Sequence, residues 1–132
     1  MRDDVDLTTL DGAFATAHLP TALAVPDGWY TVTVETVALR RTRRTGRPML
    51  CWTLRIVSPP EWAARRLWRH LVLSRDHLGW LKQDLRLCGV ELSRLSALPN
   101  YLARLRGVHL EVTKRTRDDY PVVRFHRRDP AP

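Results

Sequence analysis

Apolar and polar residues alternate along two neighbouring stretches of the chain, 29–40 and 49–57. Alternation with a period of two is typical of a β-strand with one buried face, so each stretch predicts a strand. In the first stretch the parity of the apolar residues changes after Val34, which predicts a β-bulge near Glu35 or Thr36. The two stretches therefore predict a curved antiparallel pair, and the fold must be built around it.

Three further strands and two helices are predicted downstream. The strands are expected at 66–73, 108–113 and 120–127, and the helices at 74–89 and 99–105. Ser74 is a suitable N-cap for the longer helix, and Gly89 and Gly107 are suitable C-terminal stops for the two helices. The strand at 66–73 has an ambiguous register, because Leu67 and Leu71 share one parity with Leu73, while Trp68, His70 and Val72 share the other.

The order strand, strand, strand, helix, strand, strand is the order of the OB-fold. This fold is a five-stranded Greek-key barrel that binds oligonucleotides on strands 2 and 3 and on the loops between strands 1 and 2 and strands 4 and 5. We therefore expect a mainly β protein with a helical connection between strands 3 and 4. Residues 1–25 are expected to form an acidic N-terminal arm, residues 26–128 the OB-fold domain, and residues 129–132 a short tail.

The charge of the chain is strongly positive and unevenly distributed. Lys and Arg total 22 against 14 Asp and Glu, a formal net charge of +8. Residues 1–27 carry −4, so the remainder carries +12. Such an excess predicts a polyanionic partner. The preference for Arg over Lys does not explain the excess, because exchanging one for the other leaves the net charge unchanged.

Two basic runs fall where the OB-fold has its binding loops. The run 40–47 would form the loop between strands 1 and 2, and the run 114–117 would open the loop between strands 4 and 5. The basic residues expected to bind nucleic acid are Arg40, Arg41, Arg43, Arg44, Arg47, Arg55, Arg66, Arg69, Lys114, Arg115 and Arg117. Each run alone could be a solvated loop, but two runs at two binding loops favour a cationic track for phosphates.

Aromatic side chains would supply surfaces on which bases stack. Trp52 shares the parity of the apolar residues of its strand, and Trp80 lies in a helix, so both are expected in the core. Trp62 and Trp68 lie in or beside an arginine-rich connection, where stacking on bases is expected for Trp62 and is open for Trp68. Tyr120, beside the loop between strands 4 and 5, is a further candidate.

Several classes of function have no support in the sequence. Cys51 and Cys88 are far apart and predict reduced packing thiols rather than a zinc site. Motifs of phosphate-binding loops, nucleophile elbows and HExxH zinc sites are missing, so we expect no enzyme, no cofactor and no metal. Membrane-length apolar runs and a signal-peptide pattern are also missing, so we expect a soluble cytoplasmic protein.

Five short motifs resemble those of a known family. They are Val25–Tyr30, the turn Gly46–Leu50, the Arg-x-x-Trp at Arg65–Trp68, the run Leu81–Val90, and Gly107 before a strand. Together they are similar to a phage and prophage family related to OB-fold single-stranded DNA-binding proteins, formerly a domain of unknown function. The resemblance implies coating of single strands in phage replication or recombination inside a bacterial host, with replication or recombination proteins as partners.

We therefore expect a single-stranded DNA-binding protein that coats DNA largely without sequence specificity. Two alternatives stay open at this point: a structural or partner-binding module that uses the acidic arm, and a general binder of RNA or duplex. The sequence also leaves the oligomeric state open, a homodimer included.

Overall fold

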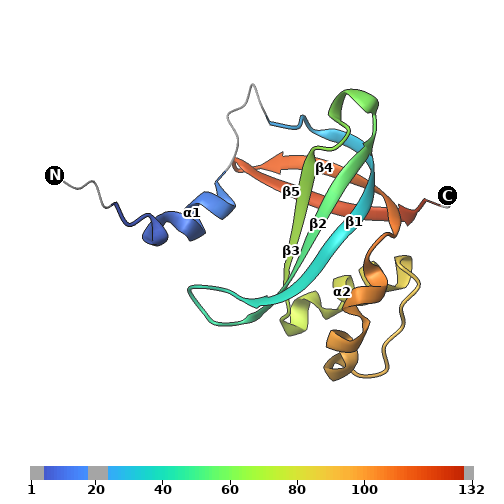
Figure 1. The fold of residues 1–132 in the computed structure, drawn as a ribbon. Helices are drawn as coiled ribbons and strands as arrows, with labels where there is room; N and C mark the ends of the chain where they lie inside the picture. Colours follow the sequence, from blue (N-terminus) through green and yellow to red (C-terminus); the bar gives the residue numbers. More distant parts are fainter. Residues whose placement is uncertain (1–4, 18–23, 130–132) are drawn as a thin grey trace.

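The computed structural model describes residues 5–17 and 24–129 (Figure 1). Parts of the expected arm and tail, residues 1–4, 18–23 and 130–132, lie outside the described residues. The elements in chain order are the 3-10 helix η1 (Thr8–Leu10), α1 (Asp11–Thr16), β1 (Gly28–Arg41), β2 (Pro48–Ser58), η2 (Pro60–Trp62), β3 (Arg66–Val72), η3 (Arg75–His77), α2 (Leu78–Leu87), η4 (Leu95–Leu105), β4 (His109–Arg117) and β5 (Tyr120–Arg128). The mainly β fold with a helical connection between the third and fourth strands is confirmed.

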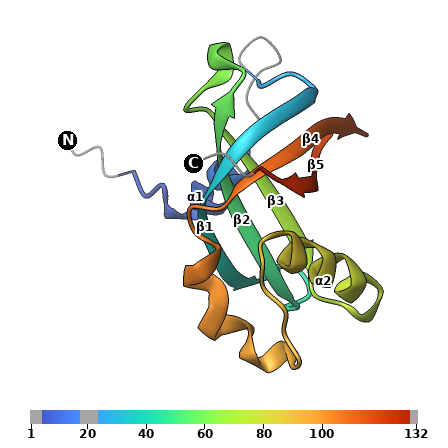
Figure 2. The same ribbon diagram turned by 90° about the vertical axis from the view of Figure 1, so that its right-hand side faces the viewer.

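The strands form one antiparallel sheet in the order β3-β2-β1-β4-β5. β1 pairs with β2 along most of its length, and its first half also pairs with β4, where Gly28 lies opposite Lys114. A register shift between Val34 and Thr36 leaves Glu35 as an extra residue, so the predicted bulge is confirmed. A bulge bends its strand. In Figures 1 and 2, β4 and β5 run across the direction of β2 and β3.

The sheet is open between its two edge strands, β3 and β5, because no ladder joins them within residues 24–129. A side chain bridges the interval instead: the guanidinium of Arg69 on β3 donates a hydrogen bond to the carbonyl oxygen of Val123 on β5. We call the line along which β3 faces β5 the seam.

The core lies on the inward face of the sheet. Its fully buried side chains include Val32, Val34, Leu50, Trp52, Leu54, Ile56, Leu98, Leu105, Leu110 and Val112. Trp52 meets Phe125 of β5 edge to face, with ring centroids 4.9 Å apart. The expectation that Trp52 belongs to the core is therefore confirmed.

The register of β3, ambiguous in the sequence, is resolved by which side chains are buried. Leu67 and Leu71 are buried together with Arg69, which shares their parity. Trp68 and His70 therefore point outward. A strand can carry apolar residues on both parities and still have one buried face, because the packing of the rest of the sheet decides which parity is covered.

The helical connection covers one end of the sheet (Figures 1 and 2). Leu81 and Leu85 of α2 are buried, and Gly89 adopts φ +81° just after the helix, as its C-terminal position requires. The second helical segment is longer than expected, because η4 already begins at Leu95. Leu98 is buried before Pro99, so packing against the core extends the segment toward its N-terminus.

The connection between β4 and β5 differs from the sequence prediction. Asp118 and Asp119 both adopt positive φ, +49° and +67°, and form a tight two-residue turn. The basic run 114–117 therefore belongs to β4 and does not open a loop.

Among the described residues, no helix has the length and apolar character that a membrane crossing would need.

Candidate nucleic-acid interface

The five arginines of the run 40–47 lie exposed at the end of the β1–β2 hairpin, which projects from the sheet in Figure 1. Backbone hydrogen bonds close the tip: Thr42 N–H donates to Arg47 O at 2.8 Å, and Gly46 N–H donates to Thr42 O at 2.9 Å. Arg41 Nη1 also donates to Gly46 O at 2.9 Å. The tip is therefore a folded turn that carries cationic side chains into solvent, and Arg41 serves partly to hold it.

The outward side chains of the first three strands are aligned in rows by the pairing register. The rows are Arg40–Met49–Val72, Ala38–Cys51–His70, Thr36–Thr53–Trp68 and Thr33–Arg55–Arg66. We define the outer face of β2–β3 as Thr53, Arg55, Arg66, Trp68 and His70. Two arginines, an imidazole and an indole thus share one surface with short neighbours.

Trp68 is the exposed aromatic of this face, with 52% of the residue accessible. On β2 it faces Thr53, and along β3 it lies between Arg66 and His70. The short threonine side chain leaves the indole uncovered on that side. Desolvation lowers the pKa of His70, and the charge of Arg40 lowers it further, so the arginines supply the positive charge of this face near neutral pH.

Arg66 is held in place by the residue that forms the bulge of β1. Its Nε donates to Glu35 Oε2 at 2.9 Å, and this hydrogen bond is the main cause of the lowered pKa of Glu35. Arg55, beside Arg66 on the paired strand, is exposed. Both side chains of the ion pair are partly accessible to solvent, so the pair positions Arg66 without removing it from the surface.

Trp62 and Tyr120 occupy different environments. Trp62 is half-buried and packs against the core, and the Arg65 guanidinium lies 5.5 Å from its ring centroid. It is therefore less available to bases than its position after two prolines predicts. Tyr120 is exposed at the start of β5, opposite Arg117 on β4. The structure does not bring either ring onto the outer face of β2–β3.

Two of the basic residues that were expected to contact phosphates are buried. Arg69 is buried: its Nε donates to Asp84 Oδ2 at 2.8 Å, and its guanidinium carbon lies 5.0 Å from the ring centroid of Phe125. Burial raises the pKa of Asp84, and Arg69 opposes that rise. Arg69 faces inward because it shares the parity of Leu67 and Leu71, so the prediction that it contacts phosphates is not supported.

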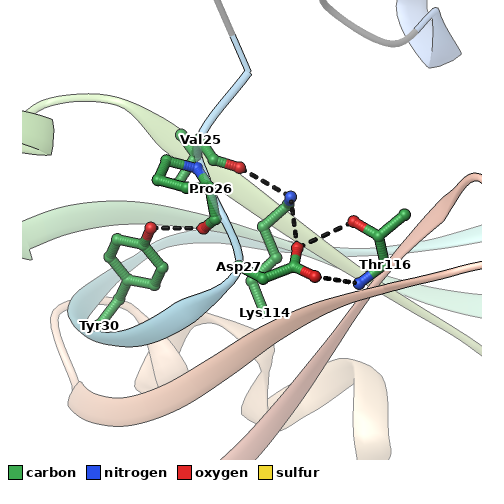
Figure 3. Close-up of polar contacts among 6 residues, drawn as sticks. All are labelled: Val25, Pro26, Asp27, Tyr30, Lys114 and Thr116. Carbon is green, nitrogen blue, oxygen red and sulfur yellow. Dashed lines mark hydrogen bonds and ion pairs between the residues drawn. The ribbon is translucent and has the colours of Figure 1, made fainter. Parts of the chain in front are cut away.

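Lys114 is likewise buried. Its ammonium donates to the carbonyl oxygen of Val25 at 2.7 Å and to Asp27 Oδ1 at 3.2 Å (Figure 3). It faces inward because it shares the parity of Leu110 and Val112 on β4. Its charge is used to bind the chain segment that precedes β1, whereas Arg115 and Arg117, farther along the strand, are exposed.

Residues 24–27, which we call the strap, are tied to β4 by a network drawn in Figure 3. Thr116 donates to the Asp27 carboxylate twice, from its N–H at 2.9 Å and from its hydroxyl at 2.8 Å. These two bonds are the main causes of the lowered pKa of Asp27. The Tyr30 hydroxyl donates to Pro26 O at 2.5 Å. The strap therefore has a fixed position beside the sheet.

A groove of about 550 Å³ lies between the strap and the seam. Its lining residues are Ala24, Val25, Pro26, Asp27, Arg66, Leu67, Trp68, Lys114, Thr116, Asp119, Pro121 and Val123. Trp68 and Arg66 belong both to this groove and to the outer face of β2–β3. The groove thus extends that face toward the β4–β5 hairpin.

Sequence reasoning did not single out three surface residues: Trp29, Arg124 and His126. Trp29 is 61% exposed at the start of β1 and lies against His126, with ring centroids 4.5 Å apart. Its parity, opposite to that of the buried Tyr30, is the signal that could have placed it outside. Nothing in the sequence pattern indicated the contact with His126, because it depends on the register between β4 and β5.

Both cysteines are free thiols; burial raises the pKa of Cys88 to about 12. Within residues 5–17 and 24–129, no three His, Cys, Asp or Glu side chains gather in a way that could hold a metal ion.

Comparison with known proteins identifies the family of this chain. No curated protein matches the sequence. A family model with the description "Protein of unknown function (DUF669)" matches residues 13–132, which include every strand and both α-helices apart from the first residues of α1. The chain therefore belongs to the DUF669 family of proteins of unknown function.

Proposed function

We propose that this protein binds single-stranded DNA on the outer face of β2–β3, largely without sequence specificity, in phage or prophage replication or recombination. The observation that carries the proposal is the exposed Trp68, which lies between Arg66 and His70 on a sheet that continues into a hairpin with five exposed arginines. The strand order and the helical connection also support an OB-fold arrangement of the sheet.

The chemistry of such a surface fits a single strand. Arginines on the β1–β2 hairpin and on the outer face would neutralise phosphates, and this interaction is independent of base identity. The indole of Trp68 would stack on one base, a contact that every base can make and that contributes about 1 to 3 kcal/mol. The bases of a duplex are stacked on each other, so a lone tryptophan on a sheet favours a strand with free bases.

The groove between the strap and the seam would take the next part of the strand. Arg66 and Trp68 lie at its β3 side, whereas at its other side Asp27 is paired with Lys114 and Asp119 adds negative charge. Phosphates are therefore expected to follow the arginine side, with bases turned toward Trp68. This proposal assigns binding and no catalytic step.

A second candidate function uses the arm as a docking segment for another protein. Leu7, Leu10 and Phe14 follow one another at helical spacing across η1 and α1, and all three are exposed. Asp6 and Asp11 give this segment a negative charge, so the partner would carry a basic surface around an apolar one. This candidate takes precedence if the purified protein has no affinity for nucleic acid.

The test is a titration of labelled oligo-dT at several salt concentrations, with duplex DNA and RNA of matched length. The parent should prefer oligo-dT, and Trp68→Ala should weaken binding about five- to hundredfold through the loss of one stacked base. Leu95→Ala removes an exposed apolar side chain from η4 in the helical connection, outside this face, and should leave binding unchanged. Equal affinity of the parent and Trp68→Ala, at equal thermal stability, would refute the proposed site.

A further inference from the structure

A second exposed aromatic and cationic surface lies on the other half of the sheet. The pairing register aligns Trp29 of β1 with Thr113 of β4 and Arg124 of β5, so these three residues form one outward row. Trp29 packs against His126 at 42° between ring planes, and Thr113 Oγ1 lies 2.8 Å from His126 Nε2. The ring of Trp29 is thus held in place while most of it stays exposed.

The other end of the row meets α2. The guanidinium carbon of Arg124 lies 5.3 Å from the ring centroid of Trp80, which is 44% exposed although its helical position predicted burial. A cation over one face of an indole orients both groups. The row Trp29–Thr113–Arg124 therefore connects two exposed tryptophans. We call Trp29, Trp80, Arg124 and His126 the second surface.

The charge around the second surface is positive. Arg115 on β4 and Arg127 on β5 are exposed, in addition to Arg124. Glu111 supplies an acidic group on this part of the sheet and is paired with Arg127. Fixed indoles within a cationic field match the requirements of a strand with free bases and a charged backbone, the same chemistry as at Trp68. Charge complementarity thus indicates a polyanion as the occupant.

The two surfaces belong to one sheet and are separated by a definable interval. Trp29 and Thr36, the β1 residue in the row of Trp68, are seven residues apart, or about 23 Å at 3.3 Å per residue. Between them, the row of Arg55 and Arg66 continues through Thr33 to His109 on β4. Two exposed arginines and the half-buried polar residues Thr33 and His109 therefore connect the outer face of β2–β3 to the second surface.

We infer that the second surface binds a more distant segment of the same single strand, which thus passes around the sheet from Trp68 to Trp29. The inference rests on the proposed function and deepens it, because it assigns a second stacking site and a longer footprint. A strand too short to span the interval binds at the outer face of β2–β3, and a longer strand binds at both surfaces.

The experiment is an affinity series with oligo-dT from about 4 to about 20 nucleotides, which brackets the site sizes of single OB-folds. The affinity of the parent should rise a second time once the strand reaches both surfaces. Trp29→Ala should match the parent on the shortest strands and bind the longest about five- to hundredfold more weakly. Trp29→Phe keeps a flat ring and should restore most of the affinity that Trp29→Ala loses on long strands. Arg124→Gln should reduce the rise in affinity from short to long strands.

The outcomes separate this inference from the proposed function. Weaker binding by Trp68→Ala at all lengths, with Trp29→Ala and Arg124→Gln equal to the parent at all lengths, would overturn the second surface and leave the first in place. An equal loss of affinity by Trp29→Ala on short and long strands would also overturn it. The effect would then not depend on whether the strand is long enough to contact both surfaces. A parent without affinity for oligo-dT of any length would overturn both.

Discussion

Arg69 on β3 and Asp84 on α2 form an ion pair inside the molecule, with Arg69 Nε 2.8 Å from Asp84 Oδ2. The same guanidinium also donates to Val123 O on β5, so a single side chain connects both edges of the sheet to the helix that covers its end. The pair accounts for a charged residue at the centre of an otherwise apolar strand face.

Removing one member of this pair should cost far more stability than removing both. Arg69→Leu leaves the Asp84 carboxylate buried without its cation, and such losses amount to about 3 to 5 kcal/mol. Arg69→Leu combined with Asp84→Leu should recover a large part of that loss, because no buried charge remains. Urea unfolding of the two single variants and the double variant measures the coupling. Additive losses would show that the two residues act independently.

The arginines at the hairpin tip should control the salt dependence of binding. Replacing Arg43, Arg44 and Arg47 with glutamine should weaken binding and reduce the slope of log K against log salt by about 2, or about 0.7 for each lost phosphate contact. Thermal stability should not change, because these side chains are exposed. Arg41 is left in place because it donates to Gly46 O.

A matched control for that variant removes the same charge elsewhere. Arg86, Arg94 and Arg104 are exposed residues of the helical connection, so their replacement by glutamine lowers the net charge equally. A smaller change in slope is expected for this control. Equal slopes for the two triple variants would mean that net charge, and not the hairpin, determines the affinity.

Trp62 should behave as a packing residue. Its ring contacts the core and carries Arg65 over one face, so Trp62→Ala should lower the free energy of unfolding by up to about 3 kcal/mol. The affinity of the folded variant for oligo-dT should stay near that of the parent. Chemical denaturation and fluorescence titration measure the two quantities separately. Lost affinity at unchanged stability would instead support the stacking role predicted from its position in a loop.

Asp27 should stabilise the fold in a pH-dependent way. Hydrogen bonds from Thr116 lower its folded pKa below the unfolded value, so its contribution is present above the unfolded pKa and is lost as pH falls through the folded pKa. Asp27→Asn should cost about 1 kcal/mol at pH 7, because the side chain is half exposed, and the difference should vanish in strong acid. Glu91→Gln removes an exposed partner of Arg86 and should change stability little at any pH.

The acidic arm should compete with nucleic acid for the hairpin. Gly12 in α1 lies so close to the Arg43 guanidinium that a methyl group there would clash with it, and Figure 1 shows α1 on the side toward which the hairpin projects. Deleting residues 2–22 should therefore tighten binding at low salt and have little effect at high salt. Asp6→Asn with Asp11→Asn should reproduce part of the gain while keeping the arm. Unchanged or weaker binding after the deletion would rule out competition.

The β1–β2 hairpin and its bulge were predictable because one parity of each strand is almost purely apolar. The register of β3 was not, since Trp68 and Leu67 are both apolar and only the packing of the sheet distinguishes them. Arg69 and Lys114 misled the prediction for a related reason. A charged residue on an inward parity is expected at the surface unless its partner is known, and Asp84 and Asp27 lie far from them in the sequence.

The second surface illustrates a different limit of the sequence. Parity alone could have placed Trp29 on the outside, but its contact with His126 follows from a bulge in the pairing of β4 with β5 between Glu111 and Val112. Such a bulge brings distant side chains together without a local motif. The same holds for Arg124 and Trp80, which meet because α2 packs against β5.

The seam has a consequence for where the molecule opens. Backbone amides within a ladder exchange with solvent only when the ladder breaks, whereas no ladder joins β3 to β5 across the seam within residues 24–129. The amides that face the seam therefore lack this protection. They should be the first strand amides to acquire deuterium in the free protein. Trp68 of β3 and Val123 of β5 both line the groove beside the seam. A nucleic-acid strand bound there would contact both edge strands and slow the exchange of these amides.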